Sequence, residues 1–226
     1  MEQRLFLSSR QHGSVSVTLR RDVIVRRFAE QRCVPAGGEP YSVIEAQRGD
    51  QDLNPGMTPL PPIKEAAVLV PLIDRPDGLT VLLTHRTTHL ANHAGQVSFP
   101  GGRVDLADGD VEETALRETQ EETGLDRSHV RIIGRLDIYI TRTGFAVTPV
   151  VGVVTPPFEL APDPFEVAEV FEVPLSFLLD SNNHQVCSRE FEGTVRYFYA
   201  MPYGRHYIWG ATAGILMNLY EFLRER

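Results

Sequence analysis

Residues 101–125 read GGRVDLADGDVEETALRETQEETGL, a glycine pair followed by a polar turn and a glutamate-rich segment. Asp110 can cap the first turn of a helix, and Glu113, three residues later, can complete a capping box. Gly124 suits the left-handed position just past a helix end. The sequence therefore predicts a short helix over Val111–Thr123.

Three carboxylates share one face of this helix. Glu118, Glu121 and Glu122 stand at positions i, i+3 and i+4, which lie above one another. Like charges at this spacing repel by a few tenths of a kcal/mol per pair, and a divalent cation would reverse that sign. Mg²⁺ and Mn²⁺ both prefer carboxylate oxygens. The alternative is a solvated charged face, which is the usual meaning of such a run.

The same segment resembles the Nudix box, the signature of hydrolases that cleave nucleoside diphosphates linked to another group. The positions that match the box are Gly102, Arg117, Glu118, Glu121, Glu122, Gly124 and Leu125. Three features depart from it. Asp108 stands where the first Glu is expected, Thr119 takes an apolar place, and one extra residue lies between Asp108 and Arg117.

A second motif precedes the box. Residues 82–102 read LLTHRTTHLANHAGQVSFPGG, which resembles the upstream motif of the coenzyme A pyrophosphatase branch of the Nudix family. That branch also carries the one-residue-longer box. Thr87 replaces a usual Ser or Ala, and Ala91 stands where the branch has a basic or small hydroxyl residue.

The resemblance implies metal-dependent hydrolysis of the diphosphate bond of coenzyme A and its derivatives. The products would be 4′-phosphopantetheine and adenosine 3′,5′-bisphosphate. A second hypothesis is a Nudix pyrophosphatase for another nucleoside diphosphate derivative, such as ADP-ribose, NADH or a nucleoside triphosphate. A third is a non-catalytic module that binds a nucleotide.

The resemblance also assigns roles within the box. Glu118, Glu121 and Glu122 would bind Mg²⁺ or Mn²⁺, with the backbone carbonyl of Gly102 as a further ligand. Arg117 would pair with Glu118 or Glu121 and hold the carboxylate geometry. These five residues form the predicted metal and catalytic centre.

Outside the box, the family often supplies a general base or a further metal ligand from a facing loop. Glu166 is the first candidate and Glu169 the second, although either could be an exposed carboxylate at a strand end. The predicted substrate contacts are Arg86, His93 and Arg103. Tyr207 and Trp209 either stack on adenine or seat the final helix.

Composition narrows the class of protein. The 226 residues carry a net charge of -8, which argues against binding to nucleic acid. Two cysteines, Cys33 and Cys187, are too few for a disulfide framework, so we expect a cytoplasmic protein. No stretch approaches the ~20 apolar residues of a membrane span. We expect a small-molecule substrate and leave a homodimer open.

The Pro-rich stretch at residues 54–62 marks a boundary. Residues 1–60 are predicted to form an extension and linker, with a helix over residues 19–31 whose Val23, Ile24 and Phe28 face inward. Residues 61–226 are predicted to form the Nudix hydrolase domain.

Alternating and apolar runs predict the strands of that domain. They cover residues 66–73, 80–84, 96–99, 130–140, 146–154, 166–173, 186–191 and 195–200. A brief helix that ends at Leu179 and a final helix over Ala211–Arg224 are also predicted. The order of these elements indicates an α+β protein, and the resemblance implies an α/β/α sandwich around a mixed β-sheet.

Overall fold

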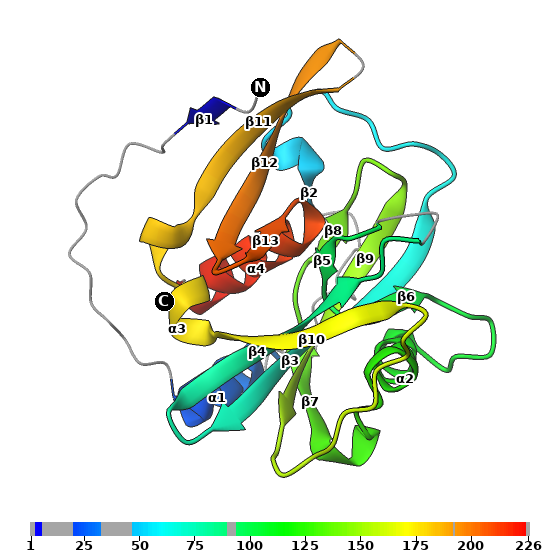
Figure 1. Cartoon of the computed structure of the whole chain (residues 1–226), viewed down its shortest axis with the longest axis vertical. Coiled ribbons are helices and arrows are strands. Elements are labelled where there is room, and N and C mark those ends of the chain that lie inside the picture. Colours follow the sequence, from blue (N-terminus) through cyan, green and yellow to red (C-terminus); the bar gives the residue numbers. More distant parts are fainter. Residues whose placement is uncertain (1–2, 6–19, 33–46, 90–93, 192, 225–226) are drawn as a thin grey trace.

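The computed structural model describes residues 3–5, 20–32, 47–89, 94–191 and 193–224. Two sheets and four α-helices build the fold (Figure 1). The helices are α1 (Arg21–Arg32), α2 (Val111–Thr123), α3 (Leu175–Leu178) and α4 (Ala211–Arg224). Within the described residues, none of the helices has both the length and the apolar character that a bilayer-spanning helix needs.

The larger sheet is mixed and runs in the order β10-β4-β3-β9-β8-β2, with β5, β6 and β7 paired to β4, β3 and β9. Its strands are β2 (Gln47–Gly49), β3 (Lys64–Arg75), β4 (Gly78–Arg86), β5 (Val97–Ser98), β6 (Gly101–Arg103), β7 (Val130–Arg135), β8 (Ile138–Ile140), β9 (Phe145–Val154) and β10 (Val167–Pro174). Strand β3 is parallel to β9 and antiparallel to β4 and β6.

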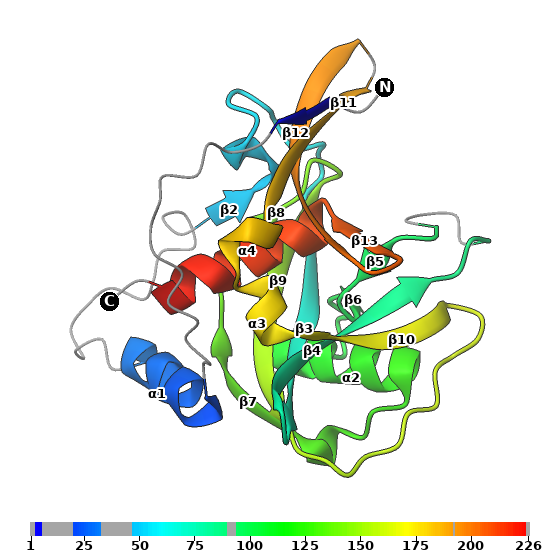
Figure 2. The same ribbon diagram turned by 60° about the vertical axis from the view of Figure 1, so that its left-hand side comes forward.

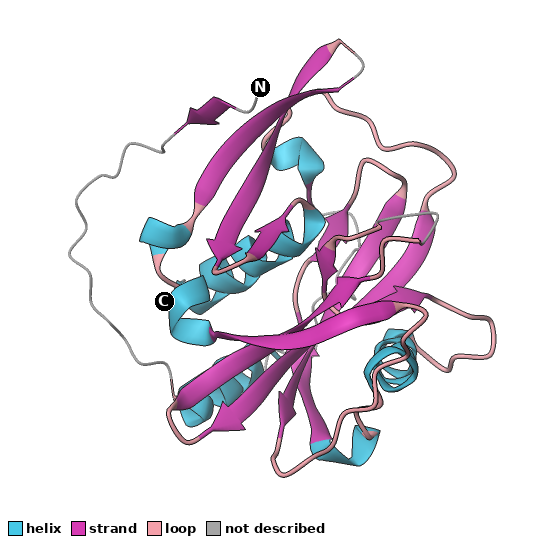
Figure 3. Ribbon diagram, in the orientation of Figure 1, coloured by secondary structure: helices cyan, strands magenta, loops and turns pink. Residues whose placement is uncertain are grey.

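The smaller sheet has the order β1-β11-β12-β13. Its strands are β1 (Gln3–Leu5), β11 (Gln185–Phe191), β12 (Thr194–Tyr203) and β13 (His206–Trp209). The β11–β12 hairpin projects beyond the larger sheet, as the strands in Figure 3 show. Strand β13 was missing from the sequence prediction, and Tyr207 and Trp209 lie within it.

Helices cover both faces of the larger sheet. Helix α2 lies on one side of β3 and β9, and α1 and α4 lie on the other (Figure 2). Because both faces are covered, the centre of β3 is almost continuously buried and apolar, as expected for a strand between two layers. The predicted α+β class and layered sandwich are confirmed.

The predicted strand over residues 130–140 is wrong in one respect, because it is divided into β7 and β8. Both pair with β9, on either side of Pro149. Proline has no N–H to donate to a ladder. Leu136 donates to the Pro149 carbonyl, and the pairing with β9 resumes only at Tyr139.

Helix α2 has the predicted bounds. The Asp110 carboxylate accepts from the backbone N–H groups of Glu112 and Glu113, and Gly124 ends the helix at φ 71°. The predicted capping box is different in one respect: the Glu113 carboxylate accepts from Arg127 at 2.9 Å rather than closing back on the cap.

Part of the N-terminal segment joins the main core. Ile24 and Phe28 of α1 are fully buried, and the Phe28 ring lies 4.4 Å from that of Phe222 in α4. Val23 was expected to face inward but is 46% exposed. The Asn54 side chain donates to and accepts from the Tyr197 backbone, so it pairs with β12 like a strand residue. The domain boundary near residue 60 stays a prediction.

Candidate active site

Strand β6 brings the glycine pair directly under α2. A Cβ atom on Gly102 would lie 2.4 Å from the carboxyl carbon of Glu118, so only glycine fits there with that carboxylate in place. The backbone N–H of Gly101 donates to the Glu122 carboxylate at 3.3 Å. The structure therefore brings Gly102, Glu118 and Glu122 together at the contact between β6 and α2.

The three glutamates differ strongly in exposure. The side chain of Glu122 is 4% exposed, that of Glu118 is 21% exposed and that of Glu121 is 60% exposed. Burial raises the pKa of Glu122 to about 7, although Arg86 and the Gly101 N–H oppose the rise. Burial also raises the pKa of Glu118, against the effect of Arg117. The cluster therefore has a buried end at Glu122 and an open, solvent-exposed end at Glu121.

Arg117 holds the open end. Its guanidinium donates to Glu118 at 2.9 Å and to Glu121 at 3.0 Å, which fits the predicted pairing. It also donates twice to Asp108, at 2.9 Å each, in a forked contact. Hydrogen bonds from Arg117 and Thr114 hold the pKa of Asp108 well below its usual range.

Sequence reasoning missed Asp108 as the anchor of Arg117. The signal was present, because Asp108 occupies the first acidic place of the box. The second departure also has an explanation in the structure. Thr119 is buried at the position of the box where an apolar residue is expected. Its hydroxyl donates to the Ala115 carbonyl at 2.6 Å, so the hydroxyl is not left without a hydrogen bond.

Arg86 holds the buried end. Its guanidinium donates to Glu122 at 2.9 Å and lies 3.5 Å from the Glu166 carboxylate. Glu166 also raises the pKa values of both Glu118 and Glu122 through its charge. The structure therefore brings the predicted base candidate Glu166 to the cluster, and it turns Arg86 toward carboxylates.

The loop that carries Glu166 is tied to the end of α2. Ala161 donates to the Thr123 carbonyl at 2.9 Å, and Asp163 donates to the Glu122 carbonyl at 3.0 Å. A Cβ atom on Gly124 would lie 2.6 Å from the Ala161 nitrogen. Gly124 thus serves both its left-handed conformation and the close approach of this loop.

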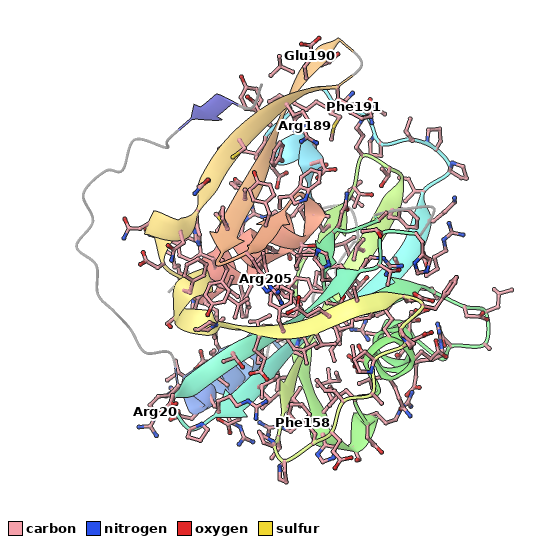
Figure 4. All side chains as sticks on the ribbon, in the orientation of Figure 1. Arg20, Phe158, Arg189, Glu190, Phe191 and Arg205 are labelled. Atoms are coloured by element: carbon pink, nitrogen blue, oxygen red, sulfur yellow. The ribbon has the colours of Figure 1, made fainter. Side chains whose placement is uncertain are left out.

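Glu169, the second base candidate, has other partners. Its carboxylate accepts from Arg205 in the turn between β12 and β13 and lies 3.9 Å from His206. Figure 4 labels Arg205 in this turn. The His206 ring stacks on Phe171 with ring centres 3.7 Å apart. Glu169 is therefore engaged with the smaller sheet, whereas Glu166 is engaged with the glutamate cluster.

The structure also locates Arg103, Tyr207 and Trp209, which were predicted as possible substrate contacts. Arg103 is exposed on β6, with its guanidinium carbon 5.5 Å from the Phe145 ring centre. His93 and Ala91 lie outside the described residues, as does Cys33. The Tyr207 hydroxyl contacts the sulfur of Cys187 at 3.8 Å, and the Trp209 ring packs edge-on against Phe198.

The cluster fits a divalent cation by its chemistry. Carboxylate oxygens are the ligands that Mg²⁺ and Mn²⁺ prefer, and a cation would favour the charged form of buried Glu122. In the described part of the chain, no three acidic, His or Cys side chains already converge as a metal site. In the structure these glutamates are paired with the guanidinium groups of Arg86 and Arg117, which supply the positive charge.

Comparison with known proteins identifies the family to which this chain is similar. The NUDIX domain model matches residues 63–191 of this chain. A Photorhabdus laumondii protein described as uncharacterized Nudix hydrolase NudL is 41% identical over 158 residues, which covers 70% of this chain and 84% of that protein. The NudL protein of Escherichia coli O157:H7 is 41% identical over 157 residues, covering 69% of this chain and 81% of that protein.

Solved structures show a weaker likeness. The NUDIX domain of Shewanella oneidensis NrtR, crystallised with ADP ribose, superposes with a TM-score of 0.45 and 20% sequence identity. The superposition covers 74% of this chain and 90% of that chain.

Proposed function

Because this chain belongs to the Nudix hydrolase family, which acts on phosphoric anhydrides, we propose that it hydrolyses the diphosphate bond of coenzyme A and its derivatives. The observation that carries the proposal is the cluster of Glu118, Glu121 and Glu122 packed against Gly102. The products would be 4′-phosphopantetheine and adenosine 3′,5′-bisphosphate.

The upstream motif supports coenzyme A as the substrate. Residues 82–102 resemble the motif of the coenzyme A branch, and the one-residue-longer box belongs to the same branch. The structure adds a role for this motif, since its Arg86 links Glu122 of the box to Glu166. This contact supports treating the motif and the box as parts of one site.

Nudix hydrolases generally use divalent metal ions, and we propose Mg²⁺ or Mn²⁺ here. The ligands would be the three glutamates and the Gly102 carbonyl. When bound, the metal would neutralise the diphosphate charge and lower the pKa of water. Arg117 would hold Glu118 and Glu121 in place through its anchor on Asp108, without touching the substrate.

Glu166 is the proposed general base. Its side chain is 43% exposed and faces the cluster from the opposite loop, where it is paired with Arg86. It would accept a proton from water as the water oxygen bonds to phosphorus. The bond from phosphorus to the bridging oxygen then breaks, and two phosphomonoesters leave. The cytoplasmic location and the homodimer stay predictions.

A substrate panel tests this proposal. The purified chain would be incubated with Mg²⁺ or Mn²⁺ and coenzyme A, 3′-dephospho-coenzyme A, ADP-ribose, NADH or a nucleoside triphosphate, and the products would be separated by chromatography. We expect the highest kcat/KM with coenzyme A. Better cleavage of ADP-ribose would replace the coenzyme A assignment with the broader pyrophosphatase activity. Binding without turnover of any compound would indicate a nucleotide-binding module.

A further inference from the structure

Two cations, Lys64 and Arg103, lie near one aromatic ring, that of Phe145. The Lys64 amine lies 5.8 Å, and the Arg103 guanidinium carbon 5.5 Å, from the centre of the Phe145 ring. Lys64 and Phe145 are direct partners in the β3–β9 ladder, and Arg103 is the partner of Ala66 in the β3–β6 ladder. We call Lys64 and Arg103 the cation pair.

This group lies on the sheet face opposite α2. Successive residues of a strand point to opposite faces. Gly102 faces Glu118 of α2, so Arg103, the next residue, points the other way, toward Phe145. Phe145 packs against the core cluster that contains residues of α1 and α4, not against the α2 side.

The two faces meet at a sheet edge. Within the described residues, strand β6 pairs with β3 and with no second strand, so it forms an edge there. Neighbouring residues in a strand are about 3.3 Å apart along the chain. A ligand that binds through two phosphate groups would therefore contact Gly102 and Arg103 at adjacent positions of this strand, from its two faces.

The cation pair is free for such a contact. Arg86 and Arg117 are occupied by carboxylates, whereas within the described ranges neither Lys64 nor Arg103 has a carboxylate within ion-pair distance. Both side chains are exposed. In a chain with a net charge of -8, two neighbouring cations without a carboxylate partner among the described residues favour the binding of an anion. Cation–π contact with Phe145 orients both groups.

We propose that Lys64 and Arg103 bind the ribose phosphate of the substrate, the phosphomonoester outside the diphosphate bond, and that Phe145 positions them. The inference rests on the proposed function, because coenzyme A carries such a group as its 3′-phosphate and ADP-ribose and NADH do not. It assigns the preference for coenzyme A over substrates without this phosphate to Lys64 and Arg103 instead of to Arg86.

The kinetic test compares coenzyme A with 3′-dephospho-coenzyme A. Arg103→Gln and Lys64→Gln should each shrink the ratio of kcat/KM for the two substrates by roughly tenfold, the scale of one charged contact. Arg103→Lys keeps a cation and should keep more of the ratio than Arg103→Gln. Unchanged ratios in both glutamine variants, with wild-type preference for coenzyme A, would overturn the inference and leave the proposed function intact.

The matched control is Arg131→Gln. Arg131 is also an exposed arginine of the larger sheet, but it pairs with Val153 at the other end of β9 from Phe145. Its loss changes the net charge by the same amount as the loss of Arg103. The substrate ratio should stay at the wild-type value, and an equal drop in this control would reduce the effect to net charge and overturn the inference.

A binding measurement tests the site without catalysis. Isothermal titration should show tighter binding of adenosine 3′,5′-bisphosphate than of adenosine 5′-monophosphate, and Arg103→Gln should remove the difference. Phe145→Leu should weaken it, because leucine fills the space but cannot orient a cation. If wild type cleaves ADP-ribose best, the proposed function fails, yet a bisphosphate preference lost in Arg103→Gln still supports the site. Equal binding of both nucleotides by wild type overturns it.

Discussion

Arg117 and Arg86 hold the same glutamate cluster from two ends in different ways. Arg117 is bound to Glu118 and Glu121 of its own helix and to Asp108 in the turn before it. Arg86 comes from the end of β4 and is bound to Glu122 and to Glu166, which are far apart in the chain. The first network is local in sequence, and the second is made by tertiary structure.

The difference in burial gives the two networks different tasks. Glu121, at the Arg117 end, is mostly exposed and can change partners at little cost in free energy. Glu122, at the Arg86 end, is buried, and its pKa is raised to about 7 because of that burial. A buried carboxylate without a cation would be costly, so Arg86 keeps Glu122 chargeable while Arg117 sets the spacing of Glu118 and Glu121.

The strongest test asks whether both ends serve catalysis. We predict that Glu122→Gln and Glu121→Gln each lower kcat by roughly two to four orders of magnitude, because a metal ligand supplies several kcal/mol to the transition state. Steady-state kinetics at saturating Mg²⁺ would measure the loss, and circular dichroism would check that each variant is folded.

The matched control is Glu113→Gln, which removes a carboxylate of the same helix that, within the described part of the chain, is paired with Arg127 and not with Arg86 or Arg117. It should keep wild-type kcat. Near-full activity in Glu121→Gln alone would confine the metal site to the buried end, and near-full activity in both variants would refute the metal assignment.

The second prediction separates charge compensation from packing at the buried end. Arg86→Gln should lower the free energy of unfolding by about 3 kcal/mol, the scale for leaving one member of a buried ion pair alone. The double variant Arg86→Gln with Glu122→Gln should be more stable than Arg86→Gln, since no uncompensated buried charge remains. Urea denaturation of the single and double variants at pH 8 measures this. Additive losses would show that Arg86 acts by packing.

The sequence predicts the Arg117 end well, for a physical reason. Helix periodicity places Glu118, Glu121 and Glu122 on one face, and the cap at Asp110 with Gly124 defines the helix bounds, so local chemistry is sufficient. The same holds for α4, whose apolar spacing is regular. The link between Arg117 and Asp108 was missed although Asp108 stands at the first acidic place of the box, because its partner lies nine residues away across the turn before the helix.

The Arg86 end could not be predicted from spacing. The approach of Arg86 to Glu122 depends on how β4 ends and on a loop tied to the carbonyls of α2, and both are set by the packing of whole elements. Strand β13 was missed because two aromatic residues before a helix suit a packing role as well as a strand. The division of β7 from β8 follows from Pro149 on a neighbouring strand, which is a long-range effect.

The third prediction concerns the cation itself. If the glutamates bind Mg²⁺ or Mn²⁺ and the unfolded chain does not, the metal stabilises the folded state by about 2.7 kcal/mol at a hundred times Kd. For a chain of this size, that corresponds to roughly 5–10 °C in Tm. Thermal denaturation with and without Mn²⁺ measures the shift.

The triple variant Glu118→Gln, Glu121→Gln and Glu122→Gln should lose this shift. A monovalent salt at equal ionic strength gives the control for general screening. A wild-type Tm that does not respond to Mn²⁺, together with turnover that does not need it, would exclude a hard-cation site at either end of the cluster.

The smallest expected effect tests the geometry of the Arg117 end. A lysine ammonium is a point charge and cannot reproduce the forked contact with Asp108 while also reaching Glu118 and Glu121. Arg117→Lys should therefore lower kcat by roughly tenfold to a hundredfold, or about 1.4–2.7 kcal/mol, with little change in KM. A raised KM with unchanged kcat would instead place Arg117 on the substrate. In that case the open end of the cluster would bind ligand directly, and only the Arg86 end would act by holding a carboxylate in place.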